Sequence, residues 1–65
     1  MNKILFDAKV DECGLKFTYI AKVLGISDQA LSKKRNGIIP FKVSEIKKLK
    51  VLFHLTDKEC NLIFL

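Results

Sequence analysis

The sequence lacks most of the features on which enzymes and metal-binding proteins depend. It has no tryptophan, a single histidine, His54, and two cysteines, Cys13 and Cys60, that stand far apart. Such sparse cysteines exclude a disulfide scaffold or a zinc site, so we expect two buried free thiols, no metal and no cofactor. No glycine-rich phosphate loop is present, and no nucleophile or carboxylate is placed to act with His54, which we interpret as a capping or core-edge residue. These absences argue against an enzyme.

Long hydrophobic runs are absent as well. The longest is Leu62–Leu65, whereas a membrane-spanning helix needs about 20 apolar residues. A cationic peptide on a membrane surface needs one continuous amphipathic helix, and the three glycines and the proline interrupt this chain. The sequence also has no secretory leader. We therefore expect a soluble cytoplasmic protein with no membrane partner and no small-molecule ligand.

What remains is the composition of one small globular domain. The chain has 65 residues, of which 49% are hydrophobic, and it has no low-complexity tract. A domain of this length has only about 3–10 kcal/mol of net stability. The apolar residues Leu62–Leu65 need a surface to pack on, which is the first helix, another subunit or both. We therefore expect a homodimer.

Positive charge is concentrated in one third of the chain. The net charge is +5 overall, and residues 27–50 alone hold seven Lys and Arg against Asp28 and Glu45. Residues 1–26 have a net charge of +1, and residues 51–65 have a net charge of −1. A solvated lysine-rich face is one explanation, and a polyanionic partner such as nucleic acid is the other. The positions of these lysines must decide between them.

Apolar residues recur every three or four positions throughout, which predicts an all-α fold. We expect five helices, over residues 3–13, 17–24, 28–35 and 43–53 and from residue 57 onwards. Asn2 and Ser27 are suited to cap the first and third helices, and a glycine is placed to end each of the first three. Thr56–Glu59 matches a capping box, with Leu55 and Cys60 as its hydrophobic staple.

The same spacing predicts which side chains are buried. We expect the inward positions to be Ile4, Phe6, Val10 and Cys13 in the first helix, and Val43, Ile46, Leu49 or Lys50, and Phe53 in the fourth. The loop Ile38–Phe41 is apolar, and Pro40 disfavours helical geometry at the residue before it. We expect this loop to tuck into the core.

The second and third helices predict a tight corner, because only about three residues join them. Ala21 supplies the small residue that a close approach of the two axes requires, and Gly25 can adopt the positive φ that reverses the chain. The inside of the corner is expected to be filled by Ile20, Leu24, Ile26 and Leu31.

The segment GLKFTYIAKVLGISDQALSKKRNG, residues 14–37, resembles the lambda-repressor-like helix-turn-helix family, the Xre and Cro group of phage and bacterial regulators. The Pro40-Phe41 loop, the fourth helix and the threonine-capped last helix extend the resemblance over almost the whole chain. The resemblance implies a compact five-helix domain that binds a palindromic operator as a dimer, represses or regulates transcription, and acts at the nucleoid of a bacterial or phage-infected cell.

Two positions depart from the family pattern. Lys16-Phe17 stand where members often have Thr-Gln, whose glutamine holds a phosphate, so other donors must replace that contact. Lys34 stands at a position that is commonly apolar. We expect its stem to lie on the core with the ammonium outside, or the third helix to be rotated slightly.

With Ala30 and Leu31 turned inward, the third helix presents a polar side suited to a major groove. Gln29 can pair with adenine and Lys33 can reach guanine. The expected base-reading residues are Gln29, Lys33, Ser32 and Asp28, the last of which either accepts from cytosine or complements the helix dipole. The expected backbone contacts are Lys16, Thr18, Arg35, Asn36 and Lys42, with Lys47, Lys48 and Lys50 adding long-range attraction.

Two alternatives stay open. Tyr19 either packs against the third helix or places its hydroxyl on a phosphate. The whole chain is either an operator-binding protein or a helix-turn-helix module that binds a repressor or another regulator through its apolar tail. Lysine is depleted at the centres of protein interfaces, which favours DNA.

Overall fold

Five helices and no strands make up the computed structural model, which describes all residues 1–65. They are α1 (Lys3–Cys13), α2 (Phe17–Leu24), α3 (Asp28–Arg35), α4 (Val43–Leu52) and α5 (Asp57–Phe64). The predicted all-α fold is confirmed. Helices α1, α2 and α3 start and end at the predicted residues, and α4 and α5 start at the predicted residues. The fourth ends one residue earlier than predicted, because Phe53 is its C-cap. None of the helices has the length and apolar character of a membrane span.

Local hydrogen bonds set the starts of three helices. The Asn2 side chain accepts from the Leu5 N–H at 3.1 Å, and the Ser27 hydroxyl accepts from the Ala30 N–H at 3.1 Å. The predicted capping box is present at α5, where the Thr56 hydroxyl accepts from the backbone of Glu59. The Glu59 carboxylate in turn accepts from the backbone of Thr56. These caps satisfy N–H groups that have no partner inside the helix.

Helices α1 to α4 all end in the same backbone motif, in which an N–H bonds to the carbonyl five residues earlier. The donor and acceptor pairs are Leu15 to Val10, Ile26 to Ala21, Ile38 to Lys33 and Leu55 to Lys50, at 2.9–3.2 Å. Each motif needs a left-handed residue before the donor. A glycine fills this position in three of them, and His54 fills it after α4 with φ 54°. His54 is exposed and acts through its backbone as a cap.

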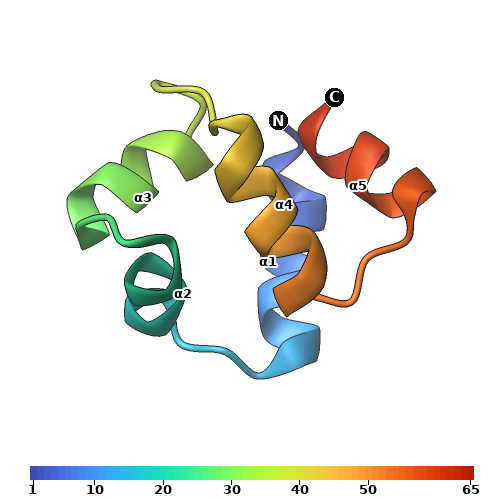
Figure 1. Ribbon diagram of the computed structural model, residues 1–65, viewed down its shortest axis with the longest axis horizontal. Coiled ribbons are helices and arrows are strands. Elements are labelled where there is room, and N and C mark those ends of the chain that lie inside the picture. Colours follow the sequence, from blue (N-terminus) through green and yellow to red (C-terminus); the bar gives the residue numbers. More distant parts are fainter.

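The core is a cluster of nine buried hydrophobic residues centred on Phe6. The Phe6 ring lies 5.7 Å from the ring of Phe53, 5.9 Å from Phe41 and 6.4 Å from Phe64, measured between centroids. Helix α1 passes behind α4, and the two chain ends lie side by side (Figure 1). The Asn2 N–H donates to the Ile63 carbonyl at 2.6 Å, which ties these ends together. The nine residues are Phe6, Ile20, Ala21, Leu24, Leu31, Leu49, Phe53, Leu55 and Ile63.

Two residues predicted to face inward are exposed instead, and the prediction is wrong for both. Ile4 is 81% exposed and Val43 is 69% exposed. Each stands two positions before a buried residue, Phe6 in α1 and Glu45 in α4. Two steps along an α-helix turn the side chain by about 200°. Burial of the later residue therefore directs the earlier one to solvent.

The apolar loop after α3 also differs from the prediction. Only Phe41 packs against the core, where its ring lies 5.5 Å from that of Phe64. Ile38 is 70% exposed and Ile39 is 39% exposed. Aromatic contacts hold Phe41, at the end of the loop, against the core. The start of the loop is held by backbone hydrogen bonds from Ile38 and Ile39 to the Lys33 carbonyl, which leave its side chains exposed. The chain thus keeps an apolar edge on its surface beside α3.

Candidate nucleic-acid interface

The α2–α3 corner is built from small and branched side chains. Ala21 is buried on α2, with Ile20 and Leu24 on the same side, and Leu31 of α3 is completely buried. In Figure 1, α2 is seen nearly end-on whereas α3 lies across the view, so the two helices cross steeply. Gly25 turns the chain with φ 71°, and its position offers a Cβ no clash, so the positive φ alone makes glycine suitable there. The corner anchors α3 through one side only.

The opposite side of α3 is open to solvent. Gln29, Lys33 and Asn36 are exposed, and the intervals of four and three residues place them along one stripe. Asp28 is exposed in the first turn. Helix α3 therefore brings together four of the predicted site residues on its outward face, which is composed of Asp28, Gln29, Lys33 and Asn36.

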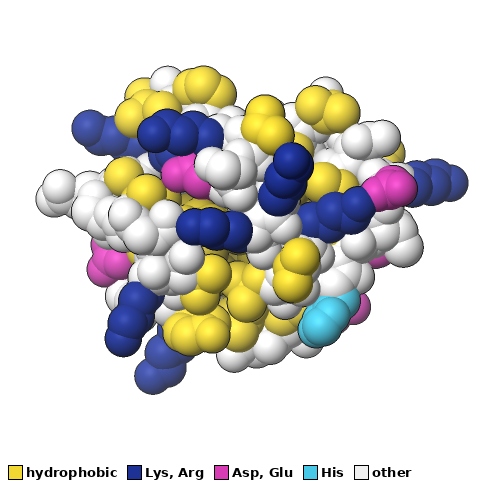
Figure 2. Space-filling view, viewed as in Figure 1, with side chains coloured by type: hydrophobic (Ala, Val, Ile, Leu, Met, Phe, Trp, Pro, Cys, Tyr) yellow, Lys and Arg dark blue, Asp and Glu magenta, His cyan; other side chains and the backbone are white.

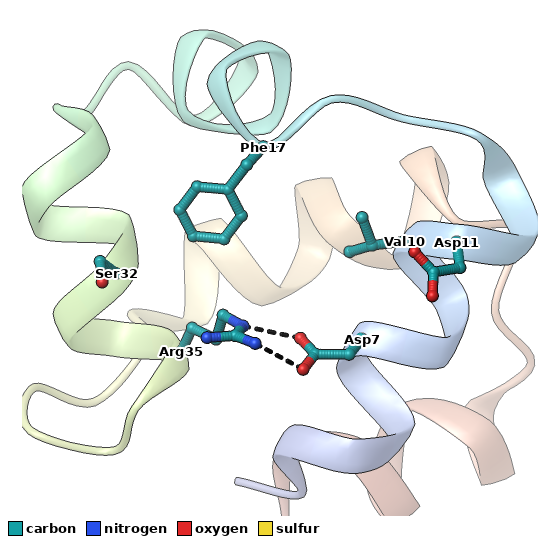
Figure 3. Close-up of a pocket in the computed structure, with 6 residues that line it drawn as sticks. All are labelled: Asp7, Val10, Asp11, Phe17, Ser32 and Arg35. Carbon is teal, nitrogen blue, oxygen red and sulfur yellow. Dashed lines mark hydrogen bonds and ion pairs between the residues drawn. The ribbon is translucent and has the colours of Figure 1, made fainter.

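Ser32 lies at the edge of this face and not at its centre. It is half-buried and lines a cleft of about 460 Å³ between α1, the start of α2, and α3. Figure 3 shows Ser32 and Arg35 reaching this cleft from α3, opposite Asp7 of α1 and below Phe17. The Asn36 amide approaches the Ser32 hydroxyl at 3.5 Å. Among the predicted base-reading residues, Ser32 has the least free surface.

Arg35, a predicted backbone contact, is held by a carboxylate of α1. Its Nε and Nη2 donate to the two oxygens of Asp7 at 2.7 and 2.6 Å (Figure 3). The hydrogen bond from Arg35 lowers the pKa of Asp7, and the same bond raises the pKa of Arg35. Both side chains are partly exposed. The two residues are 28 positions apart, and no local pattern in the sequence could have paired them.

Lys34 is buried together with its charge, so the expectation that its ammonium lies outside the core is wrong. Its Nζ lies 2.5 Å from Glu45 Oε1, and both side chains are only 7% exposed. The same oxygen accepts from the Lys42 N–H at 2.8 Å. Desolvation raises the pKa of Glu45, but the bonds from Lys34 and Lys42 outweigh it and hold the pKa below its usual 4.5. The Lys34 side chain does not extend to water because the carboxylate that pairs with its ammonium group is itself buried.

Pairing divides the basic residues of the 27–50 segment into two groups. Lys34, Arg35 and Lys50 bind Glu45, Asp7 and Asp57. The free cations of the segment, Lys33, Lys42, Lys47 and Lys48, are exposed and have no carboxylate partner. Figure 2 shows the face over α2, α3 and α4, with Lys and Arg side chains spread across it and hydrophobic ones between them. Less positive charge is available to a ligand than the sequence suggests.

The remaining predicted contacts lie on the surface near helix starts. Lys16 precedes α2, Thr18 is in its first turn, and Lys42 precedes α4, all of them exposed. Tyr19 is 49% exposed and lines a groove with residues of α4, not with α3. Its packing against the third helix stays a prediction.

Other chemistry on the surface is sparse. No group of three or more His, Cys, Asp and Glu side chains converges on a point that could hold a metal ion. Cys13 and Cys60 are free and half-buried, where the sequence predicted buried thiols. A scan of protein-family models, a search of curated proteins and a search of solved structures each found no significant match to this chain.

Proposed function

We propose that this chain is a sequence-specific double-stranded DNA-binding protein of the lambda-repressor-like helix-turn-helix type that acts as a Cro-like transcriptional regulator. One observation carries the proposal. The outward face of α3 is polar and exposed, whereas its inward side is held by the α2–α3 corner and by two ion pairs. A rigid helix with one free polar face is the element that enters a major groove.

The side chains on this face have the chemistry of base recognition. The amide of Gln29 can pair with adenine through one donor and one acceptor. Lys33, one turn later, can donate to the acceptor atoms of guanine, and Asp28 can accept from the amino group of cytosine. Ser32 sits at the cleft edge, where it allows close approach and can donate to the DNA backbone.

Contacts to the phosphates would come from the exposed residues around this face. Lys16 and Thr18 stand at the start of α2, Asn36 at the end of α3, and Lys42 at the start of α4. Lys47 and Lys48 add to the positive potential. Each neutralised phosphate releases counterions, so affinity falls steeply with salt concentration. Arg35 would join them to the extent that its unbonded N–H groups reach DNA.

Dimerisation is part of the proposal, because two copies would read the two halves of a palindromic operator. The exposed apolar side chains around the paired chain ends support it. Ile4 is 81% exposed, Leu62 57% and Leu65 94%, and Met1 and Leu5 are also exposed. A second copy of this surface would remove these groups from water. Sedimentation at about 100 μM in low salt measures this directly, and a monomer would refute the dimer while leaving DNA binding untouched.

The decisive experiment selects bound sequences from a random duplex pool and then compares variants on the enriched operator. Gln29→Ala and Lys33→Ala should each cost about 1–3 kcal/mol on the operator and relax the preference at one base pair. Lys42→Ala should weaken operator and random duplex alike and reduce the salt slope by about one unit. Equal losses on operator and random duplex for Gln29→Ala and Lys33→Ala would refute base reading by α3.

A further inference from the structure

A second surface lies between α2 and α4, away from the outward face of α3. The α2–α4 groove has a volume of about 430 Å³. Helix α2 contributes two side chains one turn apart, and α4 contributes two adjacent pairs one turn apart. They are Tyr19 and Val23 from α2, and Lys47, Lys48, Val51 and Leu52 from α4. Figure 2 views the molecule from this side.

The groove combines exposed apolar surface with unbalanced positive charge. Val51 is 75% exposed and Tyr19 is 49% exposed, so part of the apolar lining is in contact with water. Lys47 and Lys48 have no carboxylate partner, whereas Lys50 on the same helix is paired with Asp57. No Asp or Glu lines the groove. Part of its apolar lining is therefore left uncovered, and its two lysines are left unpaired.

A second groove on the molecule shows the contrast. It lies between α1 and α5 and is also largely apolar, with Leu5 and Leu62 among its residues. Its one lysine, Lys9, already lies 3.4 Å from Glu12 and 2.8 Å from Glu59. Both glutamates contact this one lysine and leave the groove with a net charge of −1, so it offers no free cation to a partner. Only the α2–α4 groove carries an uncompensated cationic rim.

We propose that the α2–α4 groove binds an acidic amphipathic helix of a protein partner. Two helices that form an apolar groove are a common seat for a third helix, which inserts its apolar stripe between them. Carboxylates on that helix would complement the unpaired ammonium groups of Lys47 and Lys48. The Tyr19 hydroxyl supplies one further donor at the rim.

The register of α4 defines what the partner must present. Lys47 stands one turn before Val51, and Lys48 stands one turn before Leu52. A helix lying along α4 meets both requirements when its two acidic residues are separated by one turn from its two large apolar residues. Acidic charge without apolar residues, or apolar residues without acid, satisfies only half of the groove.

The groove is distinct from the outward face of α3, because no residue of α3 lines it, and it shares with the DNA proposal only the long-range attraction of Lys47 and Lys48. The protein could therefore hold DNA on α3 and a protein segment on α2 and α4 at the same time. Gln29→Ala and Lys33→Ala should each weaken operator binding and relax its preference at one base pair, and both should leave the groove intact. Loss of one activity and not the other distinguishes failure of either proposal.

The test uses the full chain and a synthetic helical peptide of about 15 residues, long enough to form a helix. It carries two adjacent glutamates one turn before two leucines, and a matched control peptide carries lysines in place of the glutamates. Amide NMR shifts should appear at the six groove residues with a dissociation constant on the order of 10–100 μM. The lysine peptide should produce no shifts there.

Variants then separate charge from apolar contact. The double variant Lys47→Glu/Lys48→Glu should weaken binding of the acidic peptide by about tenfold or more, since like charges would then face each other. Val51→Asp should have a similar effect, and Lys33→Glu on α3 is the matched control that should leave peptide affinity within about twofold. All four positions are exposed, and circular dichroism verifies the fold.

Three results would overturn the proposal. One is equal binding of the acidic and lysine peptides, which would leave only apolar adhesion. Another is shifts confined to α3 or to the α1–α5 groove. The third is shifts of the groove residues by duplex DNA with none by the acidic peptide, which would reassign Lys47 and Lys48 to phosphate contacts.

Discussion

Lys33 and Lys34 are neighbours in the sequence and identical in chemistry, yet Lys33 lies on the surface and Lys34 is buried. Lys33 stands on the outward face of α3, exposed and free of any carboxylate. Lys34 points to the core, where it is 6% exposed and paired with Glu45, and its Nζ lies 6.0 Å from the centre of the Phe41 ring. One step along a helix rotates the side chain by about 100°. That rotation separates a candidate ligand contact from a structural ion pair.

The comparison shows why a charge count overestimates a binding surface. Two of the three consecutive cations at the end of α3 are engaged inside the protein, Lys34 with α4 and Arg35 with α1. Their charges are compensated by carboxylates, and the two pairs hold α3 against its neighbours. The free cations carry the field that a ligand would feel.

The largest expected effect comes from breaking the buried pair. Lys34→Ala leaves the Glu45 carboxylate buried with only the Lys42 N–H as a donor, and this should lower the free energy of unfolding by about 3–5 kcal/mol. That loss is comparable to the whole stability of so small a domain, so the variant should be largely unfolded. Urea denaturation followed by circular dichroism measures it.

Two controls sharpen this result. Lys33→Ala removes the same side chain from the outward face and should change stability by no more than about 0.5 kcal/mol. Lys34→Met combined with Glu45→Leu removes both charges and should restore most of the loss, since apolar pairs often replace buried ion pairs without cost. Equal effects of Lys34→Ala and Lys33→Ala would refute the assigned difference.

Acid should weaken the paired carboxylates next. A hydrogen bond from Lys9, supported by the Thr56 N–H, lowers the pKa of Glu59 from its usual 4.5 to about 2, and the pKa values of Asp7 and Glu45 are also lowered. The unfolded chain then binds protons at a higher pH than the folded one. Stability from Glu59 is complete above pH 4.5 and is lost as the pH falls towards about 2.

Urea midpoints measured across this pH range provide the check. The urea midpoint should fall less steeply with decreasing pH in Glu59→Gln than in the parent chain, because that variant removes one of the carboxylates whose protonation weakens the fold. Lys33→Gln on the outward face changes no carboxylate, so it is the matched control and should reproduce the pH dependence of the parent chain. An unchanged slope in Glu59→Gln would contradict the assignment.

Asp7→Asn should lower the free energy of unfolding only slightly and should strengthen DNA binding. The pair with Arg35 is partly exposed, so its loss should cost about 1 kcal/mol or less. Removal of the carboxylate frees the Arg35 guanidinium, which should increase affinity for any duplex and steepen the salt slope by about one unit. Titration at several salt concentrations measures both. Weaker DNA binding in Asp7→Asn would mean that Asp7 positions Arg35 for a phosphate.

The smallest effect is expected at His54. Its left-handed φ of 54° is strained for a residue with a Cβ, whereas the other three helix ends use glycine there. His54→Gly should raise the free energy of unfolding by up to about 1 kcal/mol, reduced by the greater freedom of glycine in the unfolded chain. The midpoint of thermal unfolding reports the gain. A loss of stability would mean that the exposed imidazole makes a contact of its own.

Most helix boundaries could be predicted because the interactions that set them are local. Asn2, Ser27 and Thr56 bond to backbone groups three residues away. The prediction failed where a residue depends on a distant partner. Ile4 and Val43 fit an apolar helical pattern, but packing of Phe6 and pairing of Glu45 rotated both of them outward.

The candidate site was predictable in part for the same reason. Gln29, Lys33 and Asn36 share a stripe by helical spacing alone, and the structure places all three in solvent. The engagement of Arg35 by Asp7 and the α2–α4 groove had no signal in the sequence, because each joins segments far apart in the chain.

By itself, the sequence determined five helices, their caps and the polar stripe of α3, since these depend on side chains within one turn of each other. Tertiary structure alone decided which Lys and Arg side chains are free and which are paired with a carboxylate of the same chain. An ion pair forms only where folding brings two charges together, and the energy of that pair depends on how much water the surrounding side chains exclude.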